Sequence, residues 1–178
     1  DVTLVGVVNA DIGLSLPSYR SSERVFQLIT QAVGRSGRSD KKGEAIIQTY
    51  NPTHYAITMA ARQDYELFYR KEMEMRKLQA YPPYTYLASV TVSSKNEENA
   101  IDAVYRIIDK LHDELKDEAV ILGPSTPYVP YEKNNHVRTI MVKYKNPEIV
   151  KKSLQKLLRS SLNKNGINLT VNIDPYNL

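Results

Sequence analysis

Hydrophobic and polar positions along the first fifty residues alternate in blocks that have the lengths of strands and helices. Residues 2–8 are almost all apolar and mostly β-branched, which is typical of a strand covered on both faces in a parallel sheet. Apolar residues at helical spacing follow over residues 21–33, and residues 43–49, which contain Ala-Ile-Ile, are expected to form a second buried strand. With a loop over residues 12–21, this order predicts a βαβ unit, the last part of a parallel, doubly wound domain over residues 1–50.

Residues 51–81 are expected to form a helical linker. Asn51-Pro52 interrupts the apolar pattern, and helical periodicity resumes over residues 53–62 and 64–79. The aromatic stripe of the second helix is interpreted as a packing surface, with a platform for nucleic acid as the alternative. The same helix carries Glu and Arg at the i,i+4 spacing of ion pairs. The stripe is Tyr65, Phe68, Tyr69 and Met73, and the pairs are Glu66–Arg70 and Glu72–Arg76.

From residue 82 onward, strands and amphipathic helices follow one another in the order β-α-β-β-α-β. Alternation of apolar and polar residues marks half-buried strands over residues 86–92 and 138–144. This order is that of the split βαβ, or ferredoxin-like, arrangement. We therefore predict an α+β domain over residues 82–178, with four antiparallel-type strands, both helices on one face of the sheet, and the other face partly open.

Capping residues mark the ends of the two helices in this second domain. Ser94 and Glu97 have the spacing of a capping box, which predicts the start of the first helix. Asn146 and Pro147 combine an N-cap residue with the residue favoured at the first helical position, and so predict the start of the second. Gly166 suits the C-terminal cap of that second helix.

Composition and charge restrict the chemistry. The chain has 24 Lys and Arg against 20 Asp and Glu, a net charge of +4 spread along its length, which permits an anionic partner. It has no cysteine, which excludes disulfides and thiolate zinc sites within it, and its 3 histidines lie far apart, so we expect no metal site. No apolar run approaches the roughly 20 residues that span a bilayer, so we expect no membrane partner. The chain begins on a buried-strand pattern without methionine, from which we infer a fragment of a larger protein.

The strongest candidate for chemistry is the stretch Gln31-Ala-Val-Gly-Arg-Ser-Gly-Arg38. Its glycines let the backbone approach a ligand closely, and guanidinium groups present paired donors that match phosphate oxygens. We interpret it as a loop that contacts phosphate, in a nucleotide or a nucleic acid, with a solvated basic turn as an equally supported alternative. A second candidate is Asn9-Ala10-Asp11, which follows the first strand at its carboxyl end, where α/β sheets bind ligands.

The arginine stretch and its surroundings carry a family resemblance. The pattern QxxGRxGR over Gln31–Arg38 is typical of superfamily 2 helicases. Its flanks, DVTLVGVVNADIGLSLPSYRSSERVFQLIT and GEAIIQTYNPTHYAI, resemble the second RecA-like lobe of the PriA family of replication-restart DNA helicases. The later YPPY, LGP and IDP segments are similar to the C-terminal domain of that family. The resemblance covers essentially the whole chain.

This resemblance implies half of an ATP site. In that superfamily the motif faces the nucleotide across a cleft between two lobes, so Gln31 and Gly34 are expected to bind nucleotide. Arg35 and Arg38 are expected to contact the γ-phosphate and to act catalytically, as an arginine finger. The phosphate-cradling loop, the acidic box for Mg²⁺ and the family's zinc-binding cysteines would lie in an upstream part of the full-length protein. We therefore expect that this chain alone does not hydrolyse ATP.

The resemblance also implies partners for the second domain, whose fold is expected to be similar to ribosomal protein S10. The family is cytoplasmic, unwinds DNA in the 3′-to-5′ direction and assembles primosome proteins at stalled forks. Its C-terminal domain takes part in binding branched DNA and the tail of single-stranded DNA-binding protein. Arg138, Lys143 and Lys145 are the candidate contacts, with an ordinary solvated strand edge as the alternative.

Two other functions remain open at this stage. The chain could be a non-catalytic module that binds nucleic acid or protein, in which the arginine loop grips a phosphate backbone. It could also belong to another superfamily 2 helicase, which would share the arginine loop but would not account for the YPPY, LGP and IDP segments.

Overall fold

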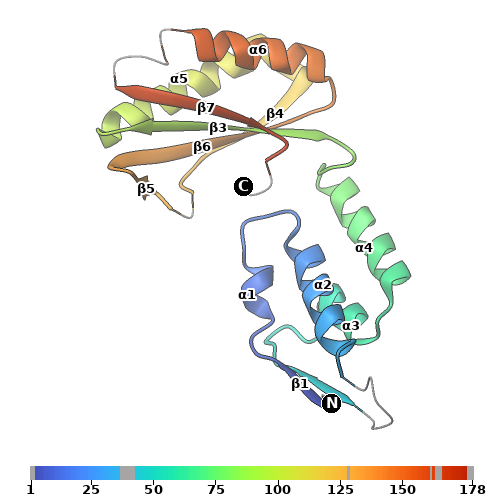
Figure 1. The fold of residues 1–178 in the computed structure, drawn as a ribbon. Helices are drawn as coiled ribbons and strands as arrows, with labels where there is room; N and C mark the ends of the chain where they lie inside the picture. The colour runs from blue at the N-terminus through green and yellow to red at the C-terminus, as the bar shows by residue number, and fades with distance from the viewer. Residues whose placement is uncertain (1–2, 37–42, 128, 161, 163–165, 176–178) are drawn as a thin grey trace. The chain divides into compact units, whose positions relative to one another are not determined.

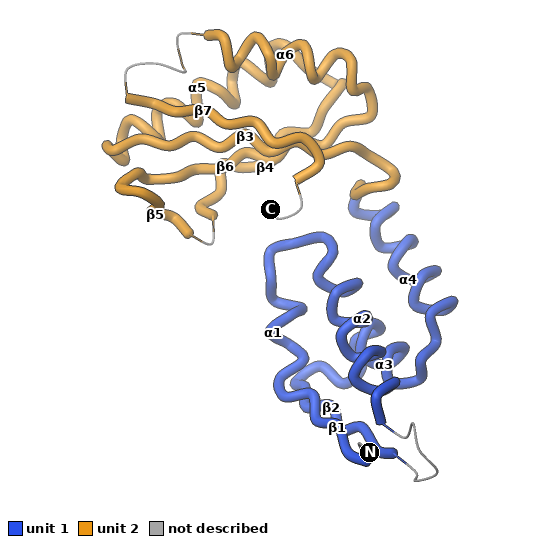
Figure 2. Tube along the Cα trace, viewed as in Figure 1, with its two compact units in different colours: residues 1–79 blue, residues 80–178 orange. Residues whose placement is uncertain are grey.

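The computed structural model of this chain forms two compact units, residues 1–79 and residues 80–178 (Figure 2). Both units mix helices and strands, but the first contains a small parallel sheet and the second an antiparallel one. The described residues are 3–36, 43–127, 129–160, 162 and 166–175.

The first unit is built on a parallel pair of strands. Strand β1 (Leu4–Val7) pairs with β2 (Glu44–Ile47) in parallel, so the predicted βαβ order is confirmed (Figure 1). Helix α2 (Ser21–Val33) lies between them in the chain. A short helix, α1 (Asp11–Leu14), occupies the start of the expected loop, and a Cβ at Gly13 would lie 2.5 Å from a methyl group of Val25. Only glycine therefore lets this segment approach α2 so closely.

Two further helices complete the core of the first unit. Helices α3 (Tyr55–Ala61) and α4 (Tyr65–Leu78) begin at His54 and Asp64, whose side chains accept from the N–H groups of Ala56 and Leu67. Both helices, which fall within the expected linker, contribute buried side chains to the same cluster as α2. The Phe26 and Phe68 rings stack with centroids 4.0 Å apart. The buried cluster comprises Ala10, Val25, Phe26, Ile29, Ala56, Ile57, Ala60 and Phe68.

The expectation that the first strand is covered on both faces is wrong for the described residues, and the second strand is likewise covered on one face only. Side chains alternate along β1 and β2, and Val7 and Ile47 pack against the buried cluster. On the other face Leu4 is 58% exposed and Ile46 is 55% exposed. Both faces of β1 and β2 carry apolar side chains, as in strands that are buried on two sides. Within the described residues, however, only one face is covered.

The second unit has the predicted split βαβ order with one added strand. Strand β3 (Tyr86–Ser94), helix α5 (Glu97–Leu115), a short 3-10 turn (Lys116–Glu118) and β4 (Ala119–Ser125) come first. They are followed by β5 (Tyr131–Glu132), β6 (Asn135–Tyr144), α6 (Pro147–Arg159) and β7 (Ile167–Ile173). The sheet order is β4-β6-β3-β7, all neighbours are antiparallel, and β5 pairs with β6. Figure 1 shows α5 and α6 on the same side of this sheet.

Alternation along the strands places the core of the second unit between the sheet and its two helices. Ile140, Val142 and Tyr144 of β6 are buried in this cluster, as the sequence predicts, together with alternate residues of β3. The helices contribute a row of buried side chains at helical spacing. These are Ala103, Val104, Ile107, Leu111 and Leu115 of α5, and Val150, Leu154 and Leu157 of α6.

Two predicted caps are wrong, and one is confirmed. Helix α5 is capped by Asn96, which accepts from the Asn99 N–H, because β3 extends through Ser94. Helix α6 ends at Arg159, where the Ser160 hydroxyl donates to Leu157 O, so Gly166 does not cap it. Gly166 has a φ of +82° instead and leads into β7. Asn146 and Pro147 begin α6 as predicted.

Candidate functional site

The candidate nucleotide-contacting residues lie at the C-terminal end of α2. The Gly34 N–H donates to Thr30 O at 2.9 Å, so the helical turn continues past the last residue of the helix. Ser36 donates both its N–H and its hydroxyl to Val33 O, at 3.1 and 2.8 Å. These bonds hold the backbone on both sides of Arg35, while the Arg35 side chain is exposed.

Close packing explains the glycine in this turn. A Cβ at Gly34 would lie 3.2 Å from the Thr30 carbonyl oxygen, which accepts the hydrogen bond that closes the turn. The φ of Gly34 is −67°, which is helical, so the glycine is needed here for space and not for a left-handed backbone. A larger residue would displace the turn that carries Arg35.

Gln31 lies in the last turn of α2, and Arg35 lies in the turn that follows the helix. Both side chains are exposed. Within the described part of the chain Arg35 makes no ion pair. The C-terminal end of a helix carries partial negative charge, which favours a cation at this place. Arg38 lies outside the described residues, so its placement stays a prediction.

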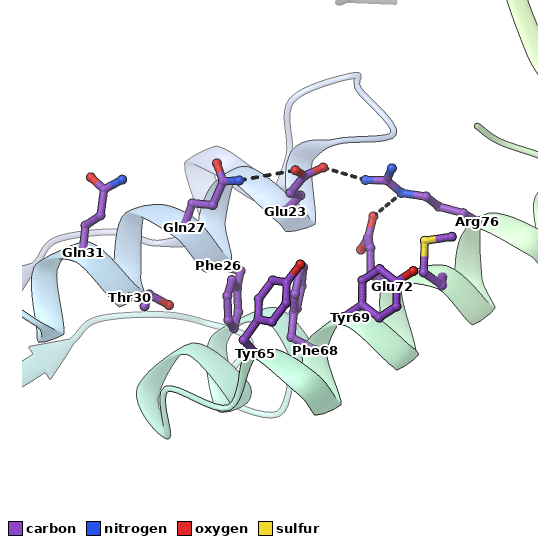
Figure 3. Close-up of a pocket in the computed structure, with 11 residues that line it drawn as sticks. Glu23, Phe26, Gln27, Thr30, Gln31, Tyr65, Phe68, Tyr69, Glu72 and Arg76 are labelled. Carbon is purple, nitrogen blue, oxygen red and sulfur yellow. Dashed lines mark hydrogen bonds and ion pairs between the residues drawn. The ribbon is translucent and has the colours of Figure 1, made fainter. Parts of the chain in front are cut away.

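Gln31 also lines a groove between α2 and α4, with a volume of about 370 Å³ (Figure 3). The aromatic stripe predicted from the sequence faces this groove: Tyr65 and Tyr69 are stacked neighbours on α4, and Phe26 of α2 lies beside them. The lining residues are Phe26, Tyr65, Phe68, Tyr69 and Met73, with Glu23, Gln27, Thr30, Gln31, Glu72 and Arg76 as the polar ones.

A cluster of charged side chains joins the two helices at one end of the groove. Arg76 donates from Nε to Glu72 and from Nη2 to Glu23, both at 2.7 Å (Figure 3). The side chains of Arg76 and Glu72 are only 14% and 7% exposed. The Tyr55 hydroxyl donates to the second oxygen of Glu72 at 2.7 Å. The predicted Glu72–Arg76 pair is confirmed, and Glu23 is a third member that sequence spacing does not indicate.

Burial and hydrogen bonding shift the pKa values of this cluster. Burial raises the pKa of Tyr55 to about 12, so its hydroxyl stays a donor at neutral pH. Burial acts to lower the pKa of Arg76, but hydrogen bonds to Glu72 and Glu23 outweigh it and hold the pKa above its ordinary value. Because Arg76 is bound to two carboxylates, it fastens α4 to α2 and is not available to a phosphate. The groove therefore offers Gln31, but no cation, to a ligand.

In the second unit, Arg138 and Lys143 lie on opposite faces of the sheet. Arg138 pairs with Val92 of β3, whose side chain is in the core, so the Arg138 side chain faces the helices. Lys143 lies an odd number of residues further along β6, and because side chains alternate along a strand it faces the other way. Lys143 Nζ lies 3.6 Å from the centre of the Tyr81 ring, and burial lowers its pKa. Lys145 follows β6 and is exposed. The three candidates therefore do not form one patch.

Arg138 is held in a small pocket. Its Nη2 donates to Glu97 Oε1 and its Nη1 donates to Val137 O at 2.9 Å, and its side chain is 14% exposed. The pocket has a volume of about 220 Å³. Apart from Arg138 it is mostly apolar, lined by Ile101, Val104, Tyr105, Pro124, Ser125 and Thr126. This arrangement can accept an apolar group next to an anion that competes with Glu97 for the guanidinium.

Neither a metal cluster nor a membrane-spanning helix is found among the described residues. No three His, Asp or Glu side chains in that part of the chain are grouped to hold a metal ion. Within the same residues, no helix combines the length and apolar character needed to cross a bilayer.

Comparisons with known proteins cover the whole chain. The profile of the Primosomal protein N C-terminal domain matches residues 77–176. The replication restart protein PriA of Bacillus subtilis (strain 168) is 39% identical over 179 residues, which include 99% of this chain and 22% of that protein. The Thermotoga maritima protein of the same name is 39% identical over 178 residues, or 100% of this chain and 23% of that protein.

A third relative shows a similar identity over a shorter region. The replication restart protein PriA of Borreliella burgdorferi is 35% identical over 156 residues, which include 88% of this chain and 24% of that protein. The chain thus spans less than a quarter of the length of each of these three relatives. In the B. subtilis and T. maritima comparisons the aligned region includes the turn Gly34–Ser36 that carries Arg35 (the arginine turn) as well as the second unit.

Proposed function

Because this chain belongs to the family of the replication restart protein PriA, we propose that it is the C-terminal part of an ATP-dependent DNA helicase. The activity would unwind DNA in the 3′-to-5′ direction at stalled or branched forks and allow primosome proteins to assemble there. The observation that carries the proposal is that Gln31–Ser36, the described part of QxxGRxGR, lie at the C-terminal end of α2 with Gln31 and Arg35 exposed, in a chain similar to these relatives over 99–100% of its length.

The first unit is proposed to be the end of a RecA-like lobe. The parallel β1–β2 pair with α2 between the two strands supports this assignment. Gln31, Gly34, Arg35 and Arg38 would form one side of the ATP site, with Arg35 and Arg38 donating to the γ-phosphate. An arginine at this place stabilises the charge that is redistributed as the phosphoryl group leaves, and so lowers the barrier to hydrolysis.

The residues present fit this role in two respects. The Arg35 guanidinium is exposed and makes no ion pair with a described residue, so its donors are available to phosphate. Its backbone is fixed by the hydrogen bonds of the Gly34–Ser36 turn, so little ordering is required when a nucleotide binds. Zinc is assigned to the remaining part of the full-length protein because this chain contains no cysteine, and Mg²⁺ is assigned there with the acidic box that the family resemblance implies.

The second unit is proposed to bind DNA and a protein partner. Lys145 is exposed and can pair with a phosphate, whereas Lys143 is partly covered and lies against Tyr81. The pocket at Arg138 fits a peptide that ends in an apolar residue and a carboxylate, and it is proposed as the binding place for the tail of single-stranded DNA-binding protein. A terminal carboxylate would replace Glu97 as the acceptor for the guanidinium, with the apolar side chain beside Pro124.

Substitutions at Arg138 and Glu97 should act in opposite directions on this peptide. Arg138→Ala should weaken binding about tenfold or more, since a charged hydrogen bond is lost, whereas Glu97→Gln should strengthen binding because Arg138 no longer has a competing carboxylate. Fluorescence anisotropy with a labelled tail peptide measures both. The same peptide amidated at its C-terminus is the control, and it should bind wild type and Arg138→Ala equally. If Arg138→Ala and Glu97→Gln both bind the free-acid peptide with the affinity of wild type, the peptide binds at another place.

The proposed helicase activity is tested by comparing the full-length protein with this chain. The full-length protein should hydrolyse ATP in the presence of DNA and should separate the strands of a fork, while the purified 178-residue chain should do neither. Turnover by the 178-residue chain would contradict the assignment of a half site. Fork binding without any ATP hydrolysis by the full-length protein would favour a non-catalytic binding module.

A further inference from the structure

The carboxyl ends of β1 and β2 form a second polar site, separate from the arginine turn. Two short segments meet there, Asn9-Ala10-Asp11 after β1 and Gln48-Thr49-Tyr50 after β2. They are joined by the Ala10 N–H, which donates to Gln48 O at 3.0 Å, and by the Gln48 N–H, which donates to Val7 O at 2.9 Å. Open α/β sheets bind ligands outside the carboxyl ends of their strands, so this is the expected place for a site.

A cavity of about 150 Å³ lies between these segments. Its lining contains two side-chain amides, one carboxylate, the threonine hydroxyl and one phenol ring with its own hydroxyl, but no lysine or arginine. Within the described part of the chain the side-chain amides of Asn9 and Gln48 have no hydrogen-bond partner. Its lining residues are Asn9, Asp11, Gln48, Thr49 and Tyr50.

Asp11 fixes the position of Tyr50. Its Oδ2 accepts from the Tyr50 N–H at 2.8 Å and its Oδ1 accepts from the Thr49 hydroxyl at 3.0 Å. The hydrogen bond from the Tyr50 backbone is the largest of the effects that lower the pKa of Asp11, so the carboxylate stays charged and keeps both bonds at neutral pH. The backbone of Tyr50 is therefore held in place before any ligand arrives.

The Tyr50 side chain has no structural role that accounts for it. It is 88% exposed, and among the described residues its ring contacts no other aromatic ring. A tyrosine on a fixed backbone is a flat apolar surface on which another ring can stack, and it loses little conformational freedom in doing so. Asn9 is held with a φ of 57°, a left-handed conformation that is uncommon for residues other than glycine and recurs at binding sites.

From these observations we propose that one unstacked base of single-stranded nucleic acid binds here. The base would stack on Tyr50 and turn its polar edge toward Asn9, Gln48 and Asp11, whose amides and carboxylate match the donors and acceptors of a base. The lining carries a carboxylate and no cation, so the site repels a phosphate and selects a base. This inference rests on the proposed action of the full-length protein on DNA and names one contact that the arginine turn does not provide.

The test uses the full-length protein and a single-stranded oligonucleotide that contains 2-aminopurine, a base whose fluorescence falls when it stacks. Tyr50→Leu should weaken binding about tenfold and reduce the quenching, since stacking is lost while an apolar side chain remains. Tyr50→Phe keeps the ring and should bind within about twofold of wild type. The salt dependence of binding should be unchanged in both variants, because no phosphate contact is removed.

The outcomes separate this inference from the proposed function. If wild type binds the oligonucleotide and Tyr50→Leu binds with equal affinity and equal quenching, the inference is wrong and the helicase proposal stands. If wild type binds no single-stranded DNA, both are wrong. If the protein quenches 2-aminopurine within the oligonucleotide, but not the free 2-aminopurine nucleotide at the same concentration, the ligand is a strand and not a mononucleotide.

Discussion

Arg35→Ala in the full-length protein should lower kcat for DNA-dependent ATP hydrolysis by about a thousandfold or more, the effect of removing an arginine finger. The guanidinium is proposed to bind the γ-phosphate most strongly in the transition state. The substitution should therefore reduce kcat and kcat/KM together and change KM little. Steady-state ATPase assays at saturating DNA measure both constants.

Two further variants make this test specific. Arg62→Ala removes another exposed arginine of the first unit, at the C-terminal end of α3, and should leave kcat unchanged. Arg35→Lys retains a charge but loses the paired donors, so its kcat should lie between those of wild type and Arg35→Ala. Wild-type kcat in Arg35→Ala, with normal DNA binding, would remove Arg35 from the ATP site.

Glu72→Ala should destabilise the first unit by about 3 kcal/mol. The substitution removes one of the two carboxylates that bind the buried Arg76 and also the acceptor of the Tyr55 hydroxyl, and losing one member of a buried ion pair costs several kcal/mol. Native-state hydrogen exchange of the 178-residue chain measures the effect for each element. Amides of α2 and α4 should lose protection, while amides of β3 and β6 in the second unit should not.

Glu66 offers a matched control on the same helix. Its pair with Arg70 has the same i,i+4 spacing at 3.4 Å, but both side chains are 72% exposed, so Glu66→Ala should change the free energy of unfolding by less than about 0.5 kcal/mol. Equal effects of the two substitutions would show that the Glu72 cluster does not stabilise the contact between α2 and α4.

The second unit illustrates which parts of the fold could be predicted. Side chains alternate across a strand with a period of two, so the apolar positions Ile140, Val142 and Tyr144 were sufficient to place one face of β6 in the core. The start of α5 could not be predicted in the same way. Ser94 is a good N-cap residue by type, but it pairs with His136 and Ile167 in the sheet, so Asn96 takes that role.

The candidate site could be predicted in part. The apolar spacing predicted a helix that ends near Val33 with the arginine stretch after it, and the structure has α2 end at Val33 with Arg35 exposed in the turn that follows. That Lys143 lies against Tyr81, and that Arg138 faces the helices beside Glu97, could not be inferred, because these contacts depend on how separate elements pack. Tyr50 gave no sequence signal, since one tyrosine after a strand is equally consistent with a buried ring.

The sequence by itself determined the order of the elements, the family and the arginine motif, because each of these is written in residues close together in the chain. Only the tertiary structure decided which charged and polar groups meet. Arg76 and Glu23 are 53 residues apart, Arg138 and Glu97 are 41 apart, and Tyr50 and Asp11 are 39 apart. Contacts over such separations follow no periodicity, because they arise from the packing of whole helices and strands around a common core.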